Sequence, residues 1–323
     1  MTSTVSVQSA SNQPASKQPA SKQKPEAVTS ALGYQKSDAE IVDYQIWHMR
    51  TPKRTLAMRG PSPASLKPKD FCASIGAADT FGRFVAQPYP QLLGEALGIS
   101  SLNLGFSGVG PSFYNQANNK TLIKLINNAK FVTISCFSGR SQENSRFKTT
   151  WQSQERYLLE DGQTIPADYA YQRLLEECDR PTVMALVEET RARYLDEFIQ
   201  LLEKITVPKV LLWFSKRSPD YKTTYDTVLN LMGGFPHLVN RNMLEILKPY
   251  CDEYVEYVDT VGLPQPLINR TTQQPVSIVR SRDYQQDKVL LTSSVLTHNR
   301  YYPSPEMHAD VARALVAVCQ KFA

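Results

Sequence analysis

The chain lacks the features that mark several large classes of protein. Its 323 residues contain no apolar run near the ~18 residues of a membrane-spanning helix, and the N-terminus has no apolar secretory segment. The five cysteines form no Cys-x-x-Cys pair, which argues against a zinc site and a disulfide framework. Lys and Arg total 36 against 31 for Asp and Glu, too small an excess to indicate nucleic-acid binding. We therefore expect a cytoplasmic protein with reduced, mostly buried thiols.

Common cofactor motifs are missing as well. The chain has no phosphate-binding Gly-x4-Gly-Lys-Ser/Thr loop and no His-Glu-x-x-His zinc motif. The glycines at 105, 108 and 110 do not have the Gly-x-Gly-x-x-Gly spacing of a dinucleotide site. We expect neither a cofactor nor a metal.

Composition divides the chain into three parts. Residues 1–36 consist largely of Ser, Gln, Ala, Pro and Lys, so they predict a disordered tail, either inert or docking a protein partner. Residues 37–69 mix apolar and basic side chains and predict an arm laid on the main domain. Residues 70–323 predict one α/β domain with insertions at about 148–182 and 260–298.

Short apolar strands alternate with helical patterns along this domain. Strands are expected at 71–75, 102–104, 131–137 and 209–215. Helices are expected at 89–97, 121–127, 183–205 and 307–322. This alternation predicts a parallel sheet covered on both sides, and ligands of such sheets bind beyond the carboxyl ends of the strands. The loops after residues 75, 104, 137 and 215 are therefore the candidate site.

The first three of these loops contain partly matching blocks. Residues 76–82 read Gly-Ala-Ala-Asp-Thr-Phe-Gly, residues 103–108 read Asn-Leu-Gly-Phe-Ser-Gly, and residues 138–146 contain Gly139 with Asn144 nearby. These blocks resemble those of the SGNH (GDSL-type) hydrolases. The resemblance implies a three-layer α/β/α sandwich around a parallel, flavodoxin-like sheet. It places the family's nucleophilic serine at Ala78 and its aspartate at Ala77.

The last block, before the C-terminal helix, allows two registers. Aligning Pro303 with the family's proline places Tyr302 at the catalytic histidine and Asn299 at the catalytic aspartate. The other register makes His308 the base. We prefer the first, in which Ala78 has no hydroxyl to attack and Tyr302, with an ordinary pKa near ~10, is a poor base at neutral pH.

The resemblance therefore leaves three functions open. The first is a protein without the standard Ser-His-Asp triad that binds an anionic or glycan-type ligand at the carboxyl edge of the sheet. The second is an active esterase or acyltransferase with a relocated nucleophile, Ser107 or Ser141, and His308 as base. The third is a scaffold whose tail docks a partner. The chain also resembles an uncharacterised bacterial family with Tyr-Tyr-Pro-Ser-Pro near the end, which implies no activity.

The candidate ligand-binding residues lie in the same loops. They are Gly76, Asp79, Thr80, Arg83, Gly105, Gly108, Ser138, Gly139, Arg140, Asn144, Arg146 and Tyr302. The three arginines suit a sulfated, acidic or nucleotide-linked sugar, because a guanidinium binds anions through a planar fork. The alternative is that each pairs with an acid such as Asp79 or Glu143. Asp79 and Thr80 can equally be helix-capping groups.

Two further segments are expected to shape the pocket. The insertion at 148–182 contains Trp151, Tyr157, Tyr169 and Tyr171, which either form an aromatic lid or simply pack on the sheet. The loop Gly233-Gly234-Phe235-Pro236-His237 suits a pocket wall. We expect His48, His237 and His298 to be structural or surface residues.

Overall fold

The computed structural model describes residues 27–28, 30–149, 155–281 and 283–323. Within them, five strands form a parallel sheet in the order β11-β10-β6-β4-β5. Read along the chain, this order is 2-1-3-4-5, that of flavodoxin-like sheets. The strands are β4 (Phe71–Gly76), β5 (Ser100–Gly105), β6 (Val132–Ser135), β10 (Lys209–Ser215) and β11 (Glu253–Val258).

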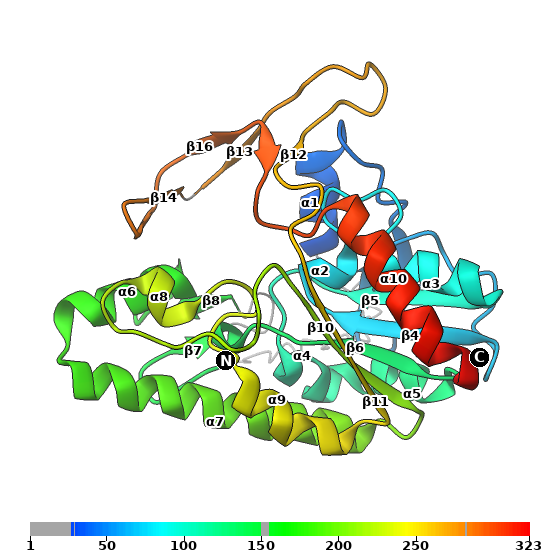
Figure 1. Ribbon diagram of the computed structural model, residues 1–323, viewed down its shortest axis with the longest axis horizontal. Helices are drawn as coiled ribbons and strands as arrows, with labels where there is room; N and C mark the ends of the chain where they lie inside the picture. Colours follow the sequence, from blue (N-terminus) through cyan, green and yellow to red (C-terminus); the bar gives the residue numbers. More distant parts are fainter. Residues whose placement is uncertain (1–26, 29, 150–154, 282) are drawn as a thin grey trace, which may run out of the picture.

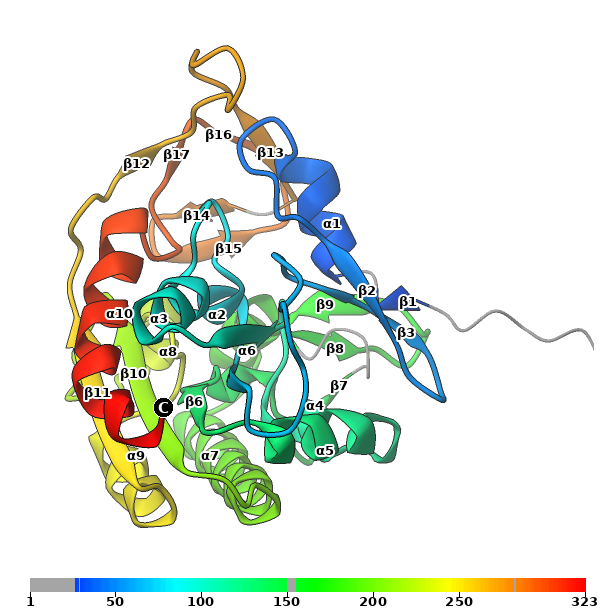
Figure 2. The ribbon, with the colours of Figure 1, turned by 90° about the vertical axis from the view of Figure 1, so that its right-hand side faces the viewer.

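Helices cover both faces of this sheet (Figure 1; Figure 2). Alternate residues of β10 show why: Val210 and Leu212 join one apolar core, whereas Leu211 and Trp213 join the other. One face packs on α3 (Tyr89–Leu97) and α10 (Pro305–Cys319). The other packs on α4 (Pro111–Asn115), α5 (Lys120–Asn128), α7 (Arg180–Lys204) and α9 (Arg241–Leu247).

Local signals set the helix boundaries. The Asp179 carboxylate accepts from the Thr182 N–H at the start of α7, and the Ser304 hydroxyl accepts from the Met307 N–H at the start of α10. Gly98, in the left-handed conformation with φ 66°, ends α3. The expected helix 89–97 and strand 209–215 are confirmed to the residue. All five cysteines are free thiols, of which Cys72, Cys136 and Cys319 are buried.

The N-terminal part differs from the predicted tail. Residues 1–26 and 29 of that tail lie outside the described residues. Its end forms β1 (Ala27–Val28) and helix α1 (Ser30–Asp38), and β1 pairs with β3 (Thr55–Met58), which also pairs with β2 (Trp47–Arg50). The tail prediction was wrong for residues 30–36, because the folded domain supplies contacts for Tyr34 that composition does not reveal.

Short elements surround the carboxyl edge of the sheet. Helix α2 (Ala78–Phe81) follows β4 directly, and a single helical turn, Gly139–Ser141, follows β6. The first insertion forms β7 (Lys148–Thr149), β8 (Arg156–Leu158), β9 (Thr164–Pro166) and α6 (Ala167–Glu177), and α8 (Val228–Met232) packs on α6. The second forms β12 (Gln265–Pro266), β13 (Ile278–Arg280), β14 (Asp283–Gln285), β15 (Lys288–Leu290), β16 (Ser294–Leu296) and β17 (His298–Asn299). Three further helical turns span Ala117–Asn119, Lys248–Tyr250 and Gln320–Phe322.

Candidate functional site

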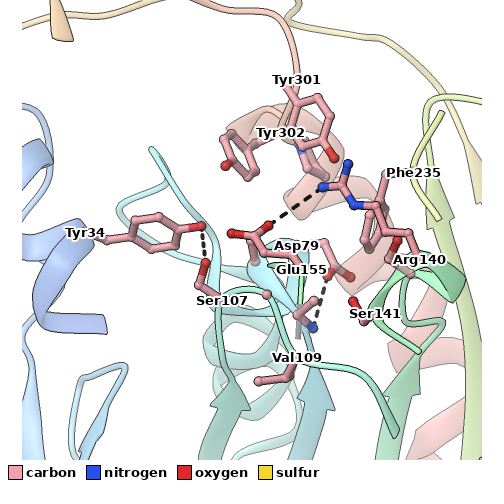
Figure 3. A pocket seen from close by; sticks show the side chains of 15 residues that line it. Tyr34, Asp79, Ser107, Val109, Arg140, Ser141, Glu155, Phe235, Tyr301 and Tyr302 are labelled. Atoms are coloured by element: carbon pink, nitrogen blue, oxygen red, sulfur yellow. Dashed lines mark hydrogen bonds and ion pairs between the residues drawn. The ribbon is translucent and has the colours of Figure 1, made fainter. Parts of the chain in front are cut away.

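A small cavity of about 50 Å3 lies where the loops after β4, β5 and β6 meet the turn before α10 (Figure 3). Parallel strands bring these loops together because their carboxyl ends share one edge of the sheet. Of the expected site residues, the cavity is lined by Ala78, Asp79, Ser107, Gly108, Ser138, Arg140, Ser141 and Tyr302. Phe235 of the expected pocket wall and Pro303 of the last block line it too. It is also lined by residues that the sequence did not single out for this site: Tyr34, Val109, Glu155 and Tyr301.

Asp79 supplies a buried carboxylate to this cavity. One of its oxygens accepts from the Ala77 N–H at 3.2 Å, and the other accepts from the hydroxyls of Ser135 and Thr80. Burial raises the pKa of Asp79 to about 6, and these hydrogen bonds oppose the rise. The carboxylate thus binds the backbone just before α2 while it lines the cavity, and α2 has no side-chain cap.

Two glycines of the motif blocks serve backbone packing instead of ligand contact. A Cβ on Gly105 would lie 2.3 Å from the Phe81 nitrogen, and one on Gly76 would lie 2.0 Å from the Thr80 hydroxyl. The Asn103 amide also donates to the Thr80 carbonyl at 2.8 Å. These contacts hold β5 against α2, which leaves no room for side chains there.

Arg140 is the cation of the cavity. Its guanidinium lies 3.4 Å from Asp168 and 3.7 Å from Glu155, and the residue is only 4% exposed. Its Nε–H has no hydrogen-bond partner among the described residues. Burial alone would lower the pKa of Arg140, but Tyr301 and Asp168 raise it overall, so the group stays charged. Arg140 therefore pairs with acids, although not with Asp79 or Glu143.

Arg83 connects distant segments at the rim of the cavity. Its Nε lies 2.9 Å from the buried Asp38 carboxylate, and its Nη1 donates to the Tyr302 hydroxyl at 3.1 Å. The guanidinium also lies over the rings of Tyr34 at 4.3 Å and Phe84 at 4.6 Å. Arg83 thus fixes α1 and the turn before α10 on the domain.

The third arginine and its neighbour lie away from the cavity. Arg146 is half exposed and pairs with Glu177 at 3.7 Å. The buried Asn144 amide contacts Tyr171 and Thr190 inside the first insertion. The structure therefore does not unite the three arginines in one anion pocket, because the loop after β6 turns into the insertion.

The last block places Tyr302, not His308, at the cavity. Tyr302 lines it together with Ala78, as the preferred register expects. Asn299 is a turn-forming residue: its amide oxygen accepts from the N–H groups of Tyr301 and Tyr302, and its amide donates to the Tyr302 carbonyl.

His308 lies in the core between α10 and the sheet. Its Nδ1 accepts from the Tyr89 N–H at 3.0 Å, and its ring packs against Phe214. Burial, assisted by the charge of Arg59, lowers the pKa of His308 to about 3. The structure does not bring His308 to Ser107 or Ser141, so neither serine has this histidine as a base. The Ser107 hydroxyl bonds to the Tyr34 hydroxyl instead.

Two larger cavities adjoin the small one. A groove of about 670 Å3 runs between α1, Arg83 and the hairpin β13–β16, and Glu155, Tyr301 and Tyr302 line both spaces. A second cavity of about 230 Å3 shares Arg140, Phe235 and Tyr301 with the small one. The glycine-rich loop that ends at His237 lines this second cavity, as expected for a pocket wall.

The described tyrosines of the first insertion pack in or against a core instead of forming an aromatic lid. Tyr157 and Tyr171 are fully buried in a core formed by α6, α7 and α8, so they pack instead of facing a ligand. Tyr169 is partly buried against the same core, and Trp151 lies outside the described residues. The insertion reaches the cavity through Glu155, a residue that belongs to none of the motif blocks.

No three His, Cys, Asp or Glu side chains among the described residues gather closely enough to hold a metal ion. No helix within the described ranges is both long and apolar enough to cross a membrane.

Comparisons with solved structures find remote similarities. One is a carbohydrate esterase family 2 enzyme with its carbohydrate-binding domain from Corynascus thermopiles (Myceliophthora fergusii): 14% identity over 83% of this chain and 71% of that one, TM-score 0.36. Another is a putative lipolytic protein of the G-D-S-L family from Desulfitobacterium hafniense DCB-2: 11% identity over 79% and 100%, TM-score 0.31. A third is the esterase domain of a Rhodothermus marinus protein: 10% identity over 85% and 97%, TM-score 0.36.

No curated protein matches the chain. One family model matches residues 32–163 and 171–323, and its description reads "Domain of unknown function (DUF6473)".

Proposed function

The chain belongs to this DUF6473 family, and from that premise we propose that it binds a glycan-type ligand at the small cavity and the adjoining groove of about 670 Å3, at a site without the standard Ser-His-Asp triad. The fold that we propose is the three-layer, flavodoxin-like sandwich of the SGNH hydrolases. The motif blocks support this resemblance, as does the strand order 2-1-3-4-5. The absence of a hydroxyl at Ala78 and the side chains of Tyr302 and Asn299 support the loss of the triad.

The charges in the cavity favour a neutral polyhydroxyl ligand over an anion. Asp79 and Glu155 are two carboxylates against the single guanidinium of Arg140, which already pairs with Asp168 and Glu155. An anion would have to displace these carboxylates. The hydroxyls of a sugar, in contrast, can donate to carboxylates and accept from Ser and Tyr hydroxyls at the same time. This excess of carboxylates is the observation that carries the proposal.

Aromatic rings at the rim suit the apolar face of a sugar ring. Tyr301 and Tyr302 line the cavity with their rings 4.9 Å apart and nearly perpendicular. Tyr302 also packs edge-on against Phe84, which fixes its ring. A rigid aromatic wall beside convergent polar groups is typical of small-ligand sites.

An acidic glycan is the second candidate. It is favoured by Arg300, which lines the adjoining groove and forms no ion pair with the described residues. In this case a neutral ring would lie against Tyr301 and Tyr302, and a carboxylate or sulfate further along the ligand would lie beside Arg300 in the groove.

A binding experiment separates these candidates. Neutral, uronic-acid-containing and sulfated oligosaccharides are titrated into the protein, with thermal shift and calorimetry as readouts. We expect neutral oligosaccharides to bind, and Tyr302→Ala to weaken their binding about tenfold, or about 1.4 kcal/mol. Tyr250→Ala, at an exposed tyrosine remote from the cavity, is the matched control. Exclusive binding of the acidic sugars would favour the second candidate, and no binding by any sugar would refute both.

A further inference from the structure

The structure pairs a serine with a histidine beside the small cavity, in loops that the motif blocks do not connect. The Ser138 Oγ lies 3.0 Å from the His237 Nδ1. Ser138 follows β6, and His237 lies between α8 and α9, 99 residues away in sequence. Each residue is 6% exposed, Ser138 lines the small cavity, and His237 lines the adjoining cavity of about 230 Å3.

Backbone contacts fix this pair. The Gly139 N–H donates to the His237 carbonyl at 2.8 Å, which ties the two loops together. Two arginines hold the histidine loop from behind. Arg217 donates to the carbonyls of Gly234 at 2.7 Å and Val239 at 2.8 Å, and Arg191 donates to the Leu238 carbonyl at 2.9 Å. The side chains of Ser138 and His237 are thus presented by a braced frame.

The second nitrogen of the imidazole also has a partner. The His237 Nε2 lies 3.4 Å from the Tyr301 hydroxyl, and the two rings stack with centroids 6.3 Å apart. With the proton on Nε2, this nitrogen donates to the Tyr301 oxygen, and the Nδ1 lone pair faces the Ser138 hydroxyl. This is the tautomer that a general base requires.

From this geometry we infer that Ser138 and His237 form a nucleophile–base pair that transfers the acyl group of an ester to water. The Ser138 Oγ bonds to the ester carbonyl carbon while His237 Nδ1 takes the hydroxyl proton. The carbon–oxygen bond to the alcohol then breaks, and the alcohol leaves with that proton. The oxygen of a water molecule then bonds to the acyl carbon, and the water gives a proton to His237. The bond between the acyl carbon and Ser138 Oγ breaks, the carboxylic acid leaves, and the proton passes from His237 to Oγ.

Two features indicate how the ester lies. Arg140 lines both cavities, and its Nε–H has no hydrogen-bond partner in the described part of the chain, so it can donate to the carbonyl oxygen as negative charge develops. The cavity on the His237 side is mainly apolar, with Val228, Leu229, Met232 and Phe235 in its wall. It suits a short aliphatic acyl chain, and the alcohol then faces the small cavity. Only the position of the alcohol rests on the proposed function.

A fluorophosphonate probe and p-nitrophenyl acetate, butyrate and decanoate test this inference on the full chain. We expect one probe adduct by intact mass, mapped to Ser138, and faster turnover of butyrate than of decanoate. Ser138→Ala should abolish the adduct, and His237→Gln should lower kcat/KM about 100-fold or more, the scale of general-base loss. Ser145→Ala and His48→Gln, both at exposed residues outside the cavities, should change neither.

The acyl cavity has its own test. Leu229→Trp fills the acyl cavity from a partly exposed position, so this variant should lower the butyrate-to-acetate rate ratio about tenfold. Ile246→Trp, at an exposed position of α9, should leave that ratio unchanged. Mapping the adduct on the wild-type protein does not depend on any variant folding. An adduct on another serine, or no adduct, overturns the inference. If the wild-type protein binds oligosaccharide but forms no probe adduct, only this inference is refuted. If it forms the adduct at Ser138 but binds no oligosaccharide, only the proposed function is refuted.

Discussion

Two adjacent corners of the same sheet edge differ in what they offer chemically. The first corner, where β4 meets the turn before α10, contains Ala78, Asn299, Tyr302 and the core residue His308. The second corner, where the loops after β6 and β10 meet, contains Ser138, Arg140 and His237. The resemblance to the SGNH hydrolases points to the first corner, where it places the nucleophile at Ala78 and the base at Tyr302. At the second corner the Ser138 hydroxyl contacts the His237 imidazole, and the Arg140 Nε–H has no hydrogen-bond partner among the described residues.

The largest expected effect comes from removing the buried cation of the second corner. Arg140→Met leaves the Asp168 carboxylate buried and Glu155 without its partner. Because the buried Asp168 carboxylate then loses the opposite charge of Arg140, we expect a loss of about 3–5 kcal/mol in the free energy of unfolding. Urea denaturation of both proteins measures it. Arg146→Met, at a half-exposed pair, should cost under about 1 kcal/mol. Equal losses in the two variants would mean that Arg140 is not buried as described.

The pH dependence of stability tests the buried groups of the first corner. The pKa of His308 falls from 6.5 to about 3 on folding, so below pH 6.5 the unfolded chain binds the proton more readily. Wild-type stability relative to His308→Gln should therefore fall as the pH drops from 6.5 towards 3, by up to ~1.4 kcal/mol per pH unit.

Protonation of the Asp79 carboxyl should change the stability in the opposite direction. Its pKa rises from 3.8 to about 6 on folding, so between these values the folded protein holds the proton more tightly. Wild-type stability relative to Asp79→Asn should rise as the pH drops from 6 to 3.8. Urea denaturation of the three proteins at pH 7, 6, 5 and 4 gives both slopes. Slopes of the same sign would contradict the placement of one of the two groups.

The smallest expected effect is at Ala78, where the resemblance to the SGNH hydrolases places a nucleophilic serine. Ala78→Ser restores the hydroxyl of the first corner, but Tyr302 and Asn299 supply neither a base nor a carboxylate there. In a protein that also carries Ser138→Ala, we expect no ester turnover above the uncatalysed rate. Adding Tyr302→His and Asn299→Asp completes a triad, and any turnover gained by that combination would show that the first corner lost only its side chains. Turnover from Ala78→Ser alone would remove the contrast between the corners.

Much of the scaffold is predictable because local patterns determine it. Strand 209–215 and helix 89–97 follow from apolar runs and from the stop at Gly98, and the expected helix at 183–205 differs from Arg180–Lys204 by a few residues. The helix Ser30–Asp38 escapes prediction because its support is remote: Asp38 pairs with Arg83, and Tyr34 packs on Phe81.

The sequence by itself determined the alternation of strands and helices and the absence of a serine hydroxyl at Ala78 and of an imidazole at Tyr302, because these follow from periodicity and from residue chemistry. Only the tertiary structure decided that His308 lies in the core, that Arg140 meets Asp168 and Glu155, and that Ser138 meets His237. Those partners are far apart in the chain. Their meeting depends on how whole loops pack against one another, and no local pattern in the sequence records that packing.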